Sequence, residues 1–331
     1  MTTNRQWLLA SRPSGVPTPE NFRLVEAPLP APSDGEVLVR VHYMSLDPYM
    51  RGRMDDSKSY AAPQALGAVM QGRTAGEVIA SRDASVAVGE WVEAPVGWQQ
   101  YGVVPAKAVR KLDVSRIPLS AYLGVVGMPG VTAWVGMNAI IDPKPGETVV
   151  VSAASGAVGG VVGQLAKLKG CRAVGVAGGA AKCEAVVGEF GFDACVDYKA
   201  GRLADDLAEA PPNGIDGNFE NVGGAVLDAV LARMNAFGRI AVCGLISGYN
   251  GQAQPVENFR SLLLNRLKVQ GFIVSEHLPL WPKAFEELSA LVADGRLKYR
   301  ETVSQGIESA PQAFIGLLAG RNFGKQLVKL V

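Results

Sequence analysis

The pattern of hydrophobic and polar positions changes about one third of the way along the chain. The first third carries short segments in which apolar and polar residues alternate, and these segments are separated by glycine and proline. The clearest of them cover Glu36–Val41, Gly76–Ala80 and Glu90–Ala94. Short alternating strands broken by such residues predict a small β-barrel.

From about Val131 the pattern becomes an alternation of helices and short apolar strands, with helices such as Ala225–Met234 between them. The predicted strands of one parallel sheet cover Thr148–Ala153, Ala173–Val176, Ala194–Val196, Ile215–Glu220 and Arg239–Cys243. This alternation is typical of the α/β class with a doubly wound parallel sheet. Residues 310–331 return to a helix and a last strand over 325–331, which we expect to pair with the first domain.

The first parallel strand runs into the spacing Ala153-x-x-Gly156-x-x-Gly159 and then into a helix. This spacing fits the dinucleotide fingerprint with alanine at its first position. Gly156 would leave room for the phosphates, and Gly159 would let helix and strand approach closely. A glycine-rich turn that binds no ligand could have the same sequence. However, the helix that ends at Gly170 and the strand that follows it complete a βαβ unit, and this context favours the dinucleotide fingerprint.

The residues after the second strand favour NADPH over NADH. Proteins that bind NAD usually carry an acidic residue about 20 positions after the glycines. Here the chain reads Ala177-Gly178-Gly179-Ala180-Ala181-Lys182. A lysine and free amides at a helix start suit a 2′-phosphate, although Lys182 could also be an ordinary solvated lysine.

Composition narrows the class of protein. The chain has 331 residues and a net charge of +1, which suits about two domains and gives no basic block for nucleic acid or an anionic membrane. Residues 1–9 lack the pattern of a secretory leader, and no run approaches the roughly 20 apolar residues of a membrane span. We therefore expect a cytoplasmic enzyme.

The four cysteines show no CxxC spacing. Cys171, Cys195 and Cys243 lie in or beside apolar runs, so we interpret them as small, reduced residues of the core.

Several strings occur in one order along the whole chain and carry a family resemblance. They are Ser45-Leu46-Asp47-Pro48-Tyr49-Met50-Arg51, Gly127-Met128-Pro129-Gly130-Val131-Thr132-Ala133, the turn from Ala153 to Gly159, Asn221-Val222-Gly223-Gly224, Cys243-Gly244-Leu245-Ile246-Ser247-Gly248-Tyr249-Asn250 and Asn322-Phe323-Gly324-Lys325. The chain resembles the zinc-independent medium-chain dehydrogenases/reductases, in the branch of 2-alkenal, prostaglandin and curcumin reductases. The resemblance implies a GroES-like β-barrel catalytic domain over 1–128 and 296–331, a Rossmann NADPH-binding domain over 129–295, and a homodimer joined through the Rossmann sheet edges.

The resemblance also implies site residues, which extend the fingerprint. The expected cofactor contacts are Ala153, Gly156, Ala157, Val158, Gly159, Gly178, Lys182, Tyr198, Asn221, Cys243, Gly244, Ile246, Tyr249, Phe272, Val274 and Asn322. Tyr49 and Tyr60 would face the cleft between the domains, although each could be a half-buried barrel tyrosine, and Met128 would shape the floor near the nicotinamide. Two positions depart from the family: Gly179 stands where serine is frequent, which puts one contact to the 2′-phosphate in doubt, and Trp134 stands where tyrosine is common, which could alter the pocket.

The residues argue against a metal and thereby constrain the chemistry. The chain has two histidines, His42 and His277, without a Cys or Glu partner at ligand spacing. The turn where zinc alcohol dehydrogenases carry a ligand has Asp47, which we expect to bond its own backbone in a structural role. Hydride delivered to an isolated carbonyl makes a localised alkoxide that needs a metal or a strong donor, whereas hydride delivered to the β-carbon of an enone makes a delocalised enolate.

Tyr249 is the candidate donor to that enolate, because its loop follows a strand at the carboxyl edge of the sheet. Its hydroxyl could instead bond the nicotinamide ribose or do both, and it could also be a surface tyrosine. The sequence thus predicts NADPH-dependent reduction of the carbon–carbon double bond of α,β-unsaturated ketones and aldehydes, without metal. A quinone reductase of the same superfamily and a non-catalytic NADPH-binding protein remain the alternatives.

Overall fold

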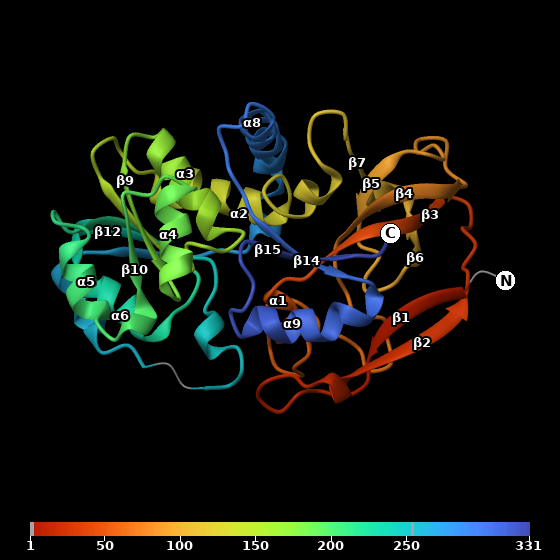
Figure 1. Cartoon of the computed structure of the whole chain (residues 1–331), viewed down its shortest axis with the longest axis horizontal. Helices are drawn as coiled ribbons and strands as arrows, with labels where there is room; N and C mark the ends of the chain where they lie inside the picture. The colour runs from red at the N-terminus through yellow and green to blue at the C-terminus, as the bar shows by residue number, and fades with distance from the viewer. Residues whose placement is uncertain (1–2, 253–254) are drawn as a thin grey trace. The chain divides into compact units, whose positions relative to one another are not determined.

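The computed structural model describes residues 3–252 and 255–331, which form two compact units (Figure 1). Unit 1 comprises Met1–Gly124 and Glu301–Val331, and unit 2 comprises Val125–Arg300. The domain limits predicted from the sequence lie after residues 128 and 295. The expectation about a secretory leader concerns residues 1–9, and the first two of these, Met1 and Thr2, lie outside the described residues.

A six-stranded parallel sheet forms the centre of unit 2. Its strands are β8 (Thr148–Ser152), β9 (Arg172–Ala177), β10 (Ala194–Asp197), β11 (Ile215–Glu220), β12 (Met234–Val242) and β13 (Lys268–Gly271). They lie in the order β10-β9-β8-β11-β12-β13, which is the doubly wound order of the Rossmann fold. The five predicted strands are confirmed. The sequence analysis missed β13, because this short edge strand is largely exposed and so lacks an apolar signal.

Helices precede, connect and follow these parallel strands and cover the two faces of the sheet. They include α2 (Met128–Val135), α3 (Gly159–Leu168), α4 (Ala180–Gly188), α5 (Leu203–Glu209), α6 (Gly224–Leu231), α7 (Ser261–Leu264) and α8 (Trp281–Ala293). Figure 1 shows α3 and α4 as one group and α5 and α6 as another. The helix predicted over Ala225–Met234 was too long. It ends at Leu231, and Met234 opens β12, where it pairs with Ile215 and is buried.

Small residues let the helices of unit 2 approach their neighbours closely. A Cβ added at Gly163 of α3 would lie 1.8 Å from Cζ of Phe192. A Cβ at Gly136, directly after α2, would lie 2.3 Å from Cε2 of Phe219 in β11. The two aromatic rings therefore fill the space that these glycines leave, which builds the close packing of a protein interior.

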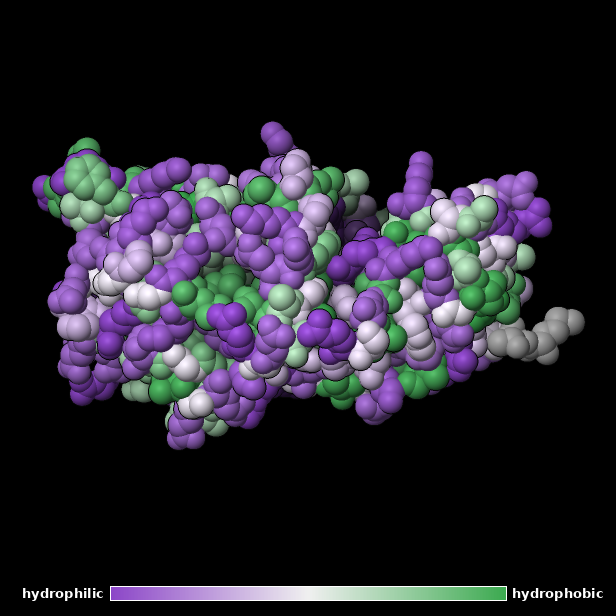
Figure 2. All heavy atoms as spheres, turned by 90° about the horizontal axis from the view of Figure 1, so that it is seen from above, coloured by the Kyte–Doolittle hydropathy of each residue, from purple (hydrophilic) through white to green (hydrophobic). Residues whose placement is uncertain are grey.

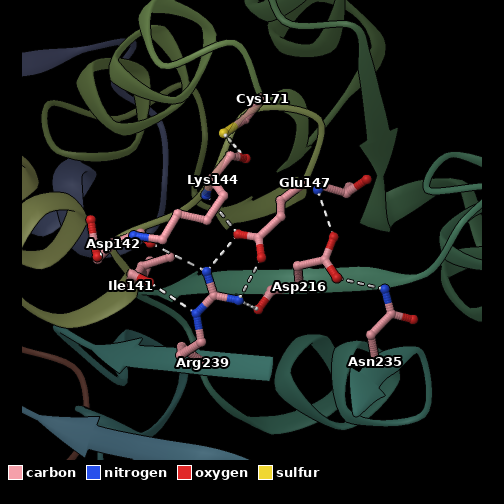
Figure 3. A network of polar contacts seen from close by, with 9 residues as sticks. Ile141, Asp142, Lys144, Glu147, Cys171, Asp216, Asn235 and Arg239 are labelled. Carbon is pink, nitrogen blue, oxygen red and sulfur yellow. Dashed lines mark hydrogen bonds and ion pairs between the residues drawn. The ribbon is translucent and has the colours of Figure 1, made fainter. Parts of the chain in front are cut away.

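A polar cluster ties together the amino ends of three neighbouring strands (Figure 3). Arg239 of β12 forms an ion pair with Glu147, which directly precedes β8, and the distance from Nη2 to Oε2 is 2.5 Å. Asp216 of β11 accepts hydrogen bonds from the Thr148 amide and from the Asn235 side chain, both at 2.8 Å. Burial is the largest effect on the pKa of Glu147 and raises it, but the hydrogen bonds from Arg239 and the Lys144 amide, together with the charges of both residues, hold this pKa below its ordinary value. These polar groups satisfy one another's hydrogen-bonding capacity and fix the register of the strands at their amino ends.

Unit 1 is built on a seven-stranded mixed sheet and a hairpin. The hairpin strands are β1 (Thr3–Leu9) and β2 (Phe22–Pro28), and the sheet strands are β3 (Glu36–Ser45), β4 (Thr74–Ser81), β5 (Trp91–Ala94), β6 (Tyr101–Pro105), β7 (Arg110–Lys111), β14 (Glu301–Gln305) and β15 (Lys325–Lys329). The predicted strands of the first third are confirmed. The last strand does pair back: β15 lies between β14 and β3, and α9 (Ala310–Leu318) packs its Phe314 against Trp98 with ring centroids 5.6 Å apart.

A buried ion pair joins the two chain segments of unit 1. Nζ of Lys325 in β15 lies 2.6 Å from Oδ1 of Asp47, and it also donates to the Leu46 carbonyl at 2.7 Å. The Ser45 hydroxyl donates to the other carboxylate oxygen of Asp47. The expectation that Asp47 bonds its own backbone was wrong, because the buried ammonium of Lys325 is the stronger partner. Its structural role is to hold the turn after β3 to the last strand.

Hydrophobic residues on the face seen in Figure 2 lie as separate patches among hydrophilic ones. None of the helices in the described part of the chain is long and apolar enough to cross a membrane.

Candidate functional site

The carboxyl ends of the six parallel strands lie at one edge of the unit 2 sheet, and most of the predicted cofactor residues follow directly after them. These are Ala153, Gly156, Ala157, Val158 and Gly159 after β8, Gly178 and Lys182 after β9, Tyr198 after β10, Asn221 after β11, Cys243, Gly244, Ile246 and Tyr249 after β12, and Phe272 and Val274 after β13. Strand order reverses between β8 and β11, and ligands of open α/β sheets bind outside the carboxyl ends at such a switch point.

The turn after β8 has the geometry of a phosphate cradle. Ala153 adopts a left-handed conformation with φ of +50°, and its carbonyl accepts from the Gly156 amide at 2.9 Å. A Cβ at Gly159 would lie 2.4 Å from that carbonyl oxygen, so only glycine fits at this position. Helix α3 then begins without a side-chain cap. An uncapped N-terminus beside small residues fits a pyrophosphate, because its first amides and the helix dipole favour anions.

The turn after β9 combines open space with positive charge. Gly179 has φ of +101° and no atom within 4 Å of an added Cβ, so a serine at this position would be strained. A Cβ at Gly178 would lie 2.9 Å from the Tyr198 hydroxyl, which places the tyrosine ring over the turn. Burial is the main effect that lowers the pKa of Lys182, and the charge of Lys199 lowers it further. Two lysines that repel one another favour a bound anion.

A carboxylate that linear spacing could not reveal also lies at this turn. Oδ1 of Asp197, at the end of β10, accepts from the Gly179 amide at 2.7 Å and from the Lys199 amide at 2.9 Å. It comes from the neighbouring strand, so counting positions after the glycines did not find it. Two amide donors stabilise its charge, and the contact fixes the start of α4 to β10.

The buried carboxylate of Glu220 organises the turn after β11. Its Oε1 accepts from the amides of Val222 and Gly223 at 2.7 and 2.8 Å and from the Ser152 hydroxyl at 2.8 Å. That hydroxyl in turn accepts from the Asn221 amide at 2.7 Å, and the Asn221 side chain donates to the Ser152 carbonyl at 2.7 Å. Sequence analysis named Asn221 but missed Glu220, because an acid at the end of an apolar strand gives no signal of its hydrogen bonds.

A recess of about 340 Å³ lies where β12 and β13 end. Its lining is formed by Val242, Cys243, Gly244, Leu245, Tyr249, Gly271, Phe272, Ile273 and Glu276. Four of these were predicted as cofactor contacts. The other five were missed because they lie in strand ends and loops whose residue types give no functional signal. A mostly apolar recess with few polar groups is the usual form of a cofactor or substrate site.

Tyr249 points its hydroxyl back toward the strand end of β12. The hydroxyl oxygen accepts from the Leu245 amide at 3.5 Å, and a Cβ at Gly244 would lie 3.1 Å from it. Tyr249 ends the 3-10 turn Ile246–Gly248, and Val274 begins a second one, Val274–Glu276. A hydroxyl that accepts from an amide can donate its own proton to a ligand oxygen.

Cys243 is adjacent to this tyrosine loop and is a poor nucleophile. Burial of its thiol is the main effect that raises the pKa of Cys243, and the charge of Glu220 adds to it, so that the pKa is about 12. The thiol is therefore protonated at neutral pH and inert, which suits a packing contact at the recess.

Two more predicted positions lie in or near α2. Met128 is the first residue of this helix and is half-buried; its carbonyl accepts from the Thr132 hydroxyl at 2.8 Å. Trp134 was expected to affect the pocket. It is 5% exposed, and its indole donates to Oε2 of Glu287 in α8 at 2.6 Å; its effect on the pocket stays a prediction.

The remaining predicted residues belong to unit 1. Tyr49 of α1 (Tyr49–Arg53) packs against the core, and burial, with a further contribution from Asp47, raises its pKa. Tyr60 is 56% exposed. The guanidinium of Arg53 lies 6.0 Å from the Tyr49 ring centroid and 4.9 Å from that of Tyr60, which brings the two tyrosines together. The Asn322 side chain donates to the Gly324 carbonyl at 2.8 Å.

The histidines have aromatic neighbours. His42 of β3 packs edge-on against Trp91 at 4.8 Å, and His277 packs against Phe272 at 6.1 Å. Among the described residues no group of three or more His, Cys, Asp and Glu could hold a metal ion. Metal independence stays a prediction.

Comparisons with known proteins agree with this geometry. A family model described as the N-terminal domain of oxidoreductase matches residues 5–112, and one described as zinc-binding dehydrogenase matches residues 157–294. An NADPH-dependent curcumin reductase of Escherichia coli is 47% identical over 99% of this chain and 97% of its own. A 2-alkenal reductase (NADP(+)-dependent) of Nicotiana tabacum is 42% identical over 98% of this chain and 97% of its own. The crystal structure of CurA in complex with NADPH from Vibrio vulnificus is 48% identical and covers 99% of both chains with a TM-score of 0.94.

The Glu220 network yields a stability prediction. Glu220→Ala leaves two amides and a hydroxyl without their acceptor and is expected to lower the free energy of unfolding by about 2–5 kcal/mol. Glu220→Gln is expected to lose less, because its oxygen can keep the amides. Its NH₂ group replaces the oxygen that accepts from Asn218 Nδ2 at 3.1 Å, and rotation of the Asn218 amide by 180° would turn its Oδ1, which has no partner among the described residues, toward that group. Urea unfolding measures the free energy of unfolding of both variants. The control is Glu286→Ala at an exposed position of α8, whose free energy of unfolding is expected to lie within about 0.5 kcal/mol of the parent value. Equal losses for the alanine and glutamine variants would contradict the network.

Proposed function

Because this chain belongs to the zinc-independent medium-chain dehydrogenases/reductases, in the branch of curcumin, 2-alkenal and prostaglandin reductases, we propose that it uses NADPH to reduce the carbon–carbon double bond of α,β-unsaturated ketones and aldehydes. The observation that carries the proposal is the carboxyl edge of the unit 2 sheet. There a phosphate cradle follows β8, a turn that leads to Lys182 follows β9, and a recess lined by Tyr249 lies after β12 and β13.

The cofactor would be held from one end of this edge to the other. The turn from Ala153 to Gly159 would hold the pyrophosphate at the start of α3. Lys182 would meet the 2′-phosphate, and Tyr198 would pack beside it. Asn221 and the recess after β12 and β13 would hold the nicotinamide half, which supplies hydride when bound.

The protein's own chemical task is to stabilise negative charge on the substrate oxygen. Addition of hydride at the β-carbon spreads that charge over the carbonyl oxygen and the α-carbon, so a neutral hydroxyl donor is sufficient. The Tyr249 hydroxyl is such a donor at the edge of the recess. The apolar lining excludes water and strengthens the bond that the hydroxyl donates. Tyr49, Tyr60 and Met128 are proposed to contact the substrate, and Asn322 to contact the cofactor.

The reaction is tested by following NADPH oxidation with short 2-alkenals, long enals, aryl enones and quinones, and by product analysis. We expect saturated ketones and aldehydes with the carbonyl intact, and turnover unchanged after dialysis against a chelator. A preference for quinones would support the quinone reductase alternative. Oxidation of NADPH with none of these acceptors would support a non-catalytic cofactor-binding protein.

The Tyr249 hydroxyl is tested by Tyr249→Phe. Loss of one oxyanion donor is expected to lower turnover by about 10²- to 10³-fold with little change in the unfolding transition. Tyr101→Phe in β6 of unit 1 is the matched control and should retain full turnover. A loss of less than about tenfold for Tyr249→Phe would assign the principal donor elsewhere, with the nicotinamide ribose hydroxyl as the next candidate.

Cofactor choice is tested by Lys182→Ala. Removing a charge-assisted bond to the 2′-phosphate is expected to reduce the preference for NADPH over NADH by about 1–3 kcal/mol. Lys167→Ala, which removes a lysine of α3 that pairs with Asp193, should leave the preference unchanged. Equal use of NADPH and NADH by the parent protein would refute this assignment of Lys182.

We infer that the chain forms a homodimer through the edge of the unit 2 sheet. Strand β13 ends the strand order, and apolar side chains beside it are exposed: Leu263 is 77% and Val269 44% accessible. An exposed apolar edge strand readily pairs with another chain. Light scattering should give twice the chain mass, and Leu263→Asp combined with Val269→Asp should halve it, whereas Val187→Asp on α4 should not. A monomeric parent would contradict the inference.

A further inference from the structure

Two of the four cysteines lie in contact beside the proposed 2′-phosphate position. Cys183 belongs to α4 and Cys195 to β10, and the Cys195 thiol donates to the Cys183 sulfur at a distance of 2.8 Å. Both residues are partly exposed, whereas Cys171 is buried. Cys195 was expected to serve as a small core residue; it is instead a partner of Cys183.

The packing holds the two sulfurs at this distance. Strand pairing places Cys195 beside Gly175 of β9, and a Cβ at Gly175 would lie 3.3 Å from the Cys195 sulfur. The missing side chain thus makes room for that sulfur under α4. A disulfide bond is about 2.05 Å long, so a closure of about 0.8 Å joins the pair.

The contact also makes the two thiols chemically different. The hydrogen bond from Cys195 lowers the pKa of Cys183, and the same bond raises the pKa of Cys195. The thiolate is the nucleophilic form of cysteine. Cys183 is therefore the sulfur that reacts first with an oxidant. Cys195 is positioned to attack the oxidised Cys183 sulfur.

We propose that Cys183 and Cys195 form a reversible disulfide when the protein meets a peroxide, and that this bond weakens binding of NADPH at the adjacent Lys182. The second part rests on the proposed function, and the first does not. Lys182 directly precedes Cys183, and Asp197, two residues after Cys195, holds the Gly179 amide at the start of the same helix. A covalent bond from α4 to β10 therefore acts on the turn that would receive the 2′-phosphate.

The chemistry balances with the peroxide as oxidant. The Cys183 thiol gives up its proton, and the resulting thiolate attacks one peroxide oxygen. The O–O bond breaks, a sulfenic acid forms, and the departing hydroxide takes up the released proton and becomes one water. The Cys195 sulfur then attacks the Cys183 sulfur: the S–S bond forms, the S–O bond breaks, and a second water leaves with the thiol proton. Two thiols have lost two electrons, which the peroxide has gained. A dithiol reductant reverses the bond by thiol–disulfide exchange.

The disulfide is tested by treating the full-length protein with hydrogen peroxide and mapping its peptides under non-reducing conditions. We expect one cross-linked peptide pair that contains Cys183 and Cys195 and disappears with dithiothreitol. Cys183→Ser and Cys195→Ser should each abolish it, and Cys171→Ala should retain it. Recovery of both cysteines as free thiols, or of Cys183 as sulfinic acid without the cross-link, would overturn the proposed bond.

The effect on the cofactor is tested by fluorescence titration of NADPH with the reduced and oxidised protein. The oxidised parent is expected to bind NADPH at least about fivefold more weakly, the lower end of typical coupling between sites, and Cys195→Ser should show no change on oxidation. Because coupling is reciprocal, saturating NADPH should also slow or diminish cross-linking. Equal affinities would overturn the coupling. Failure of the reduced protein to bind NADPH would count against the proposed function, while the peptide map would still decide the disulfide.

Discussion

The buried carboxylate of Glu220 is the interaction on which the carboxyl edge of the unit 2 sheet depends. One of its oxygens accepts from the Val222 and Gly223 amides and from the Ser152 hydroxyl, so a single side chain joins the ends of β8 and β11. Strand order reverses between these two strands, which is where a doubly wound sheet binds its ligand. A buried carboxylate is costly unless its hydrogen bonds are made, and these bonds fix the turns on either side of the switch point.

The elements with a strong local signal could be predicted from the sequence. The valine-rich run of β8, the glycine spacing after it and the glycine that ends α3 each satisfy a local rule, and the structure places them as expected. Their signal lies in consecutive residues. Strand β13 and the end of α6 were misjudged, because the edge strand is exposed and because Met234 is an apolar residue that suits helix and strand equally.

The parts that could not be predicted are contacts between residues far apart in sequence. Asp47 was expected to bond its own turn and instead pairs with Lys325, which the last strand brings beside it. Asp197 lies at the turn after β9 although linear spacing showed no acid there. Cys183 and Cys195 have no motif spacing, and only the packing of α4 on β10 brings their sulfurs together. Such contacts depend on the tertiary fold, which residue types alone do not specify.

The central claim is that hydride is delivered to carbon–carbon double bonds conjugated to a carbonyl, with the oxygen stabilised by a neutral donor. The most direct measurement uses NADPH deuterated at the transferring C4 position, an α,β-unsaturated ketone as substrate, and NMR with mass spectrometry of the product. The account predicts one deuterium on the β-carbon and an intact carbonyl group. Deuterium on a carbinol carbon, with the double bond retained, would contradict it and assign the chain the chemistry of an alcohol dehydrogenase.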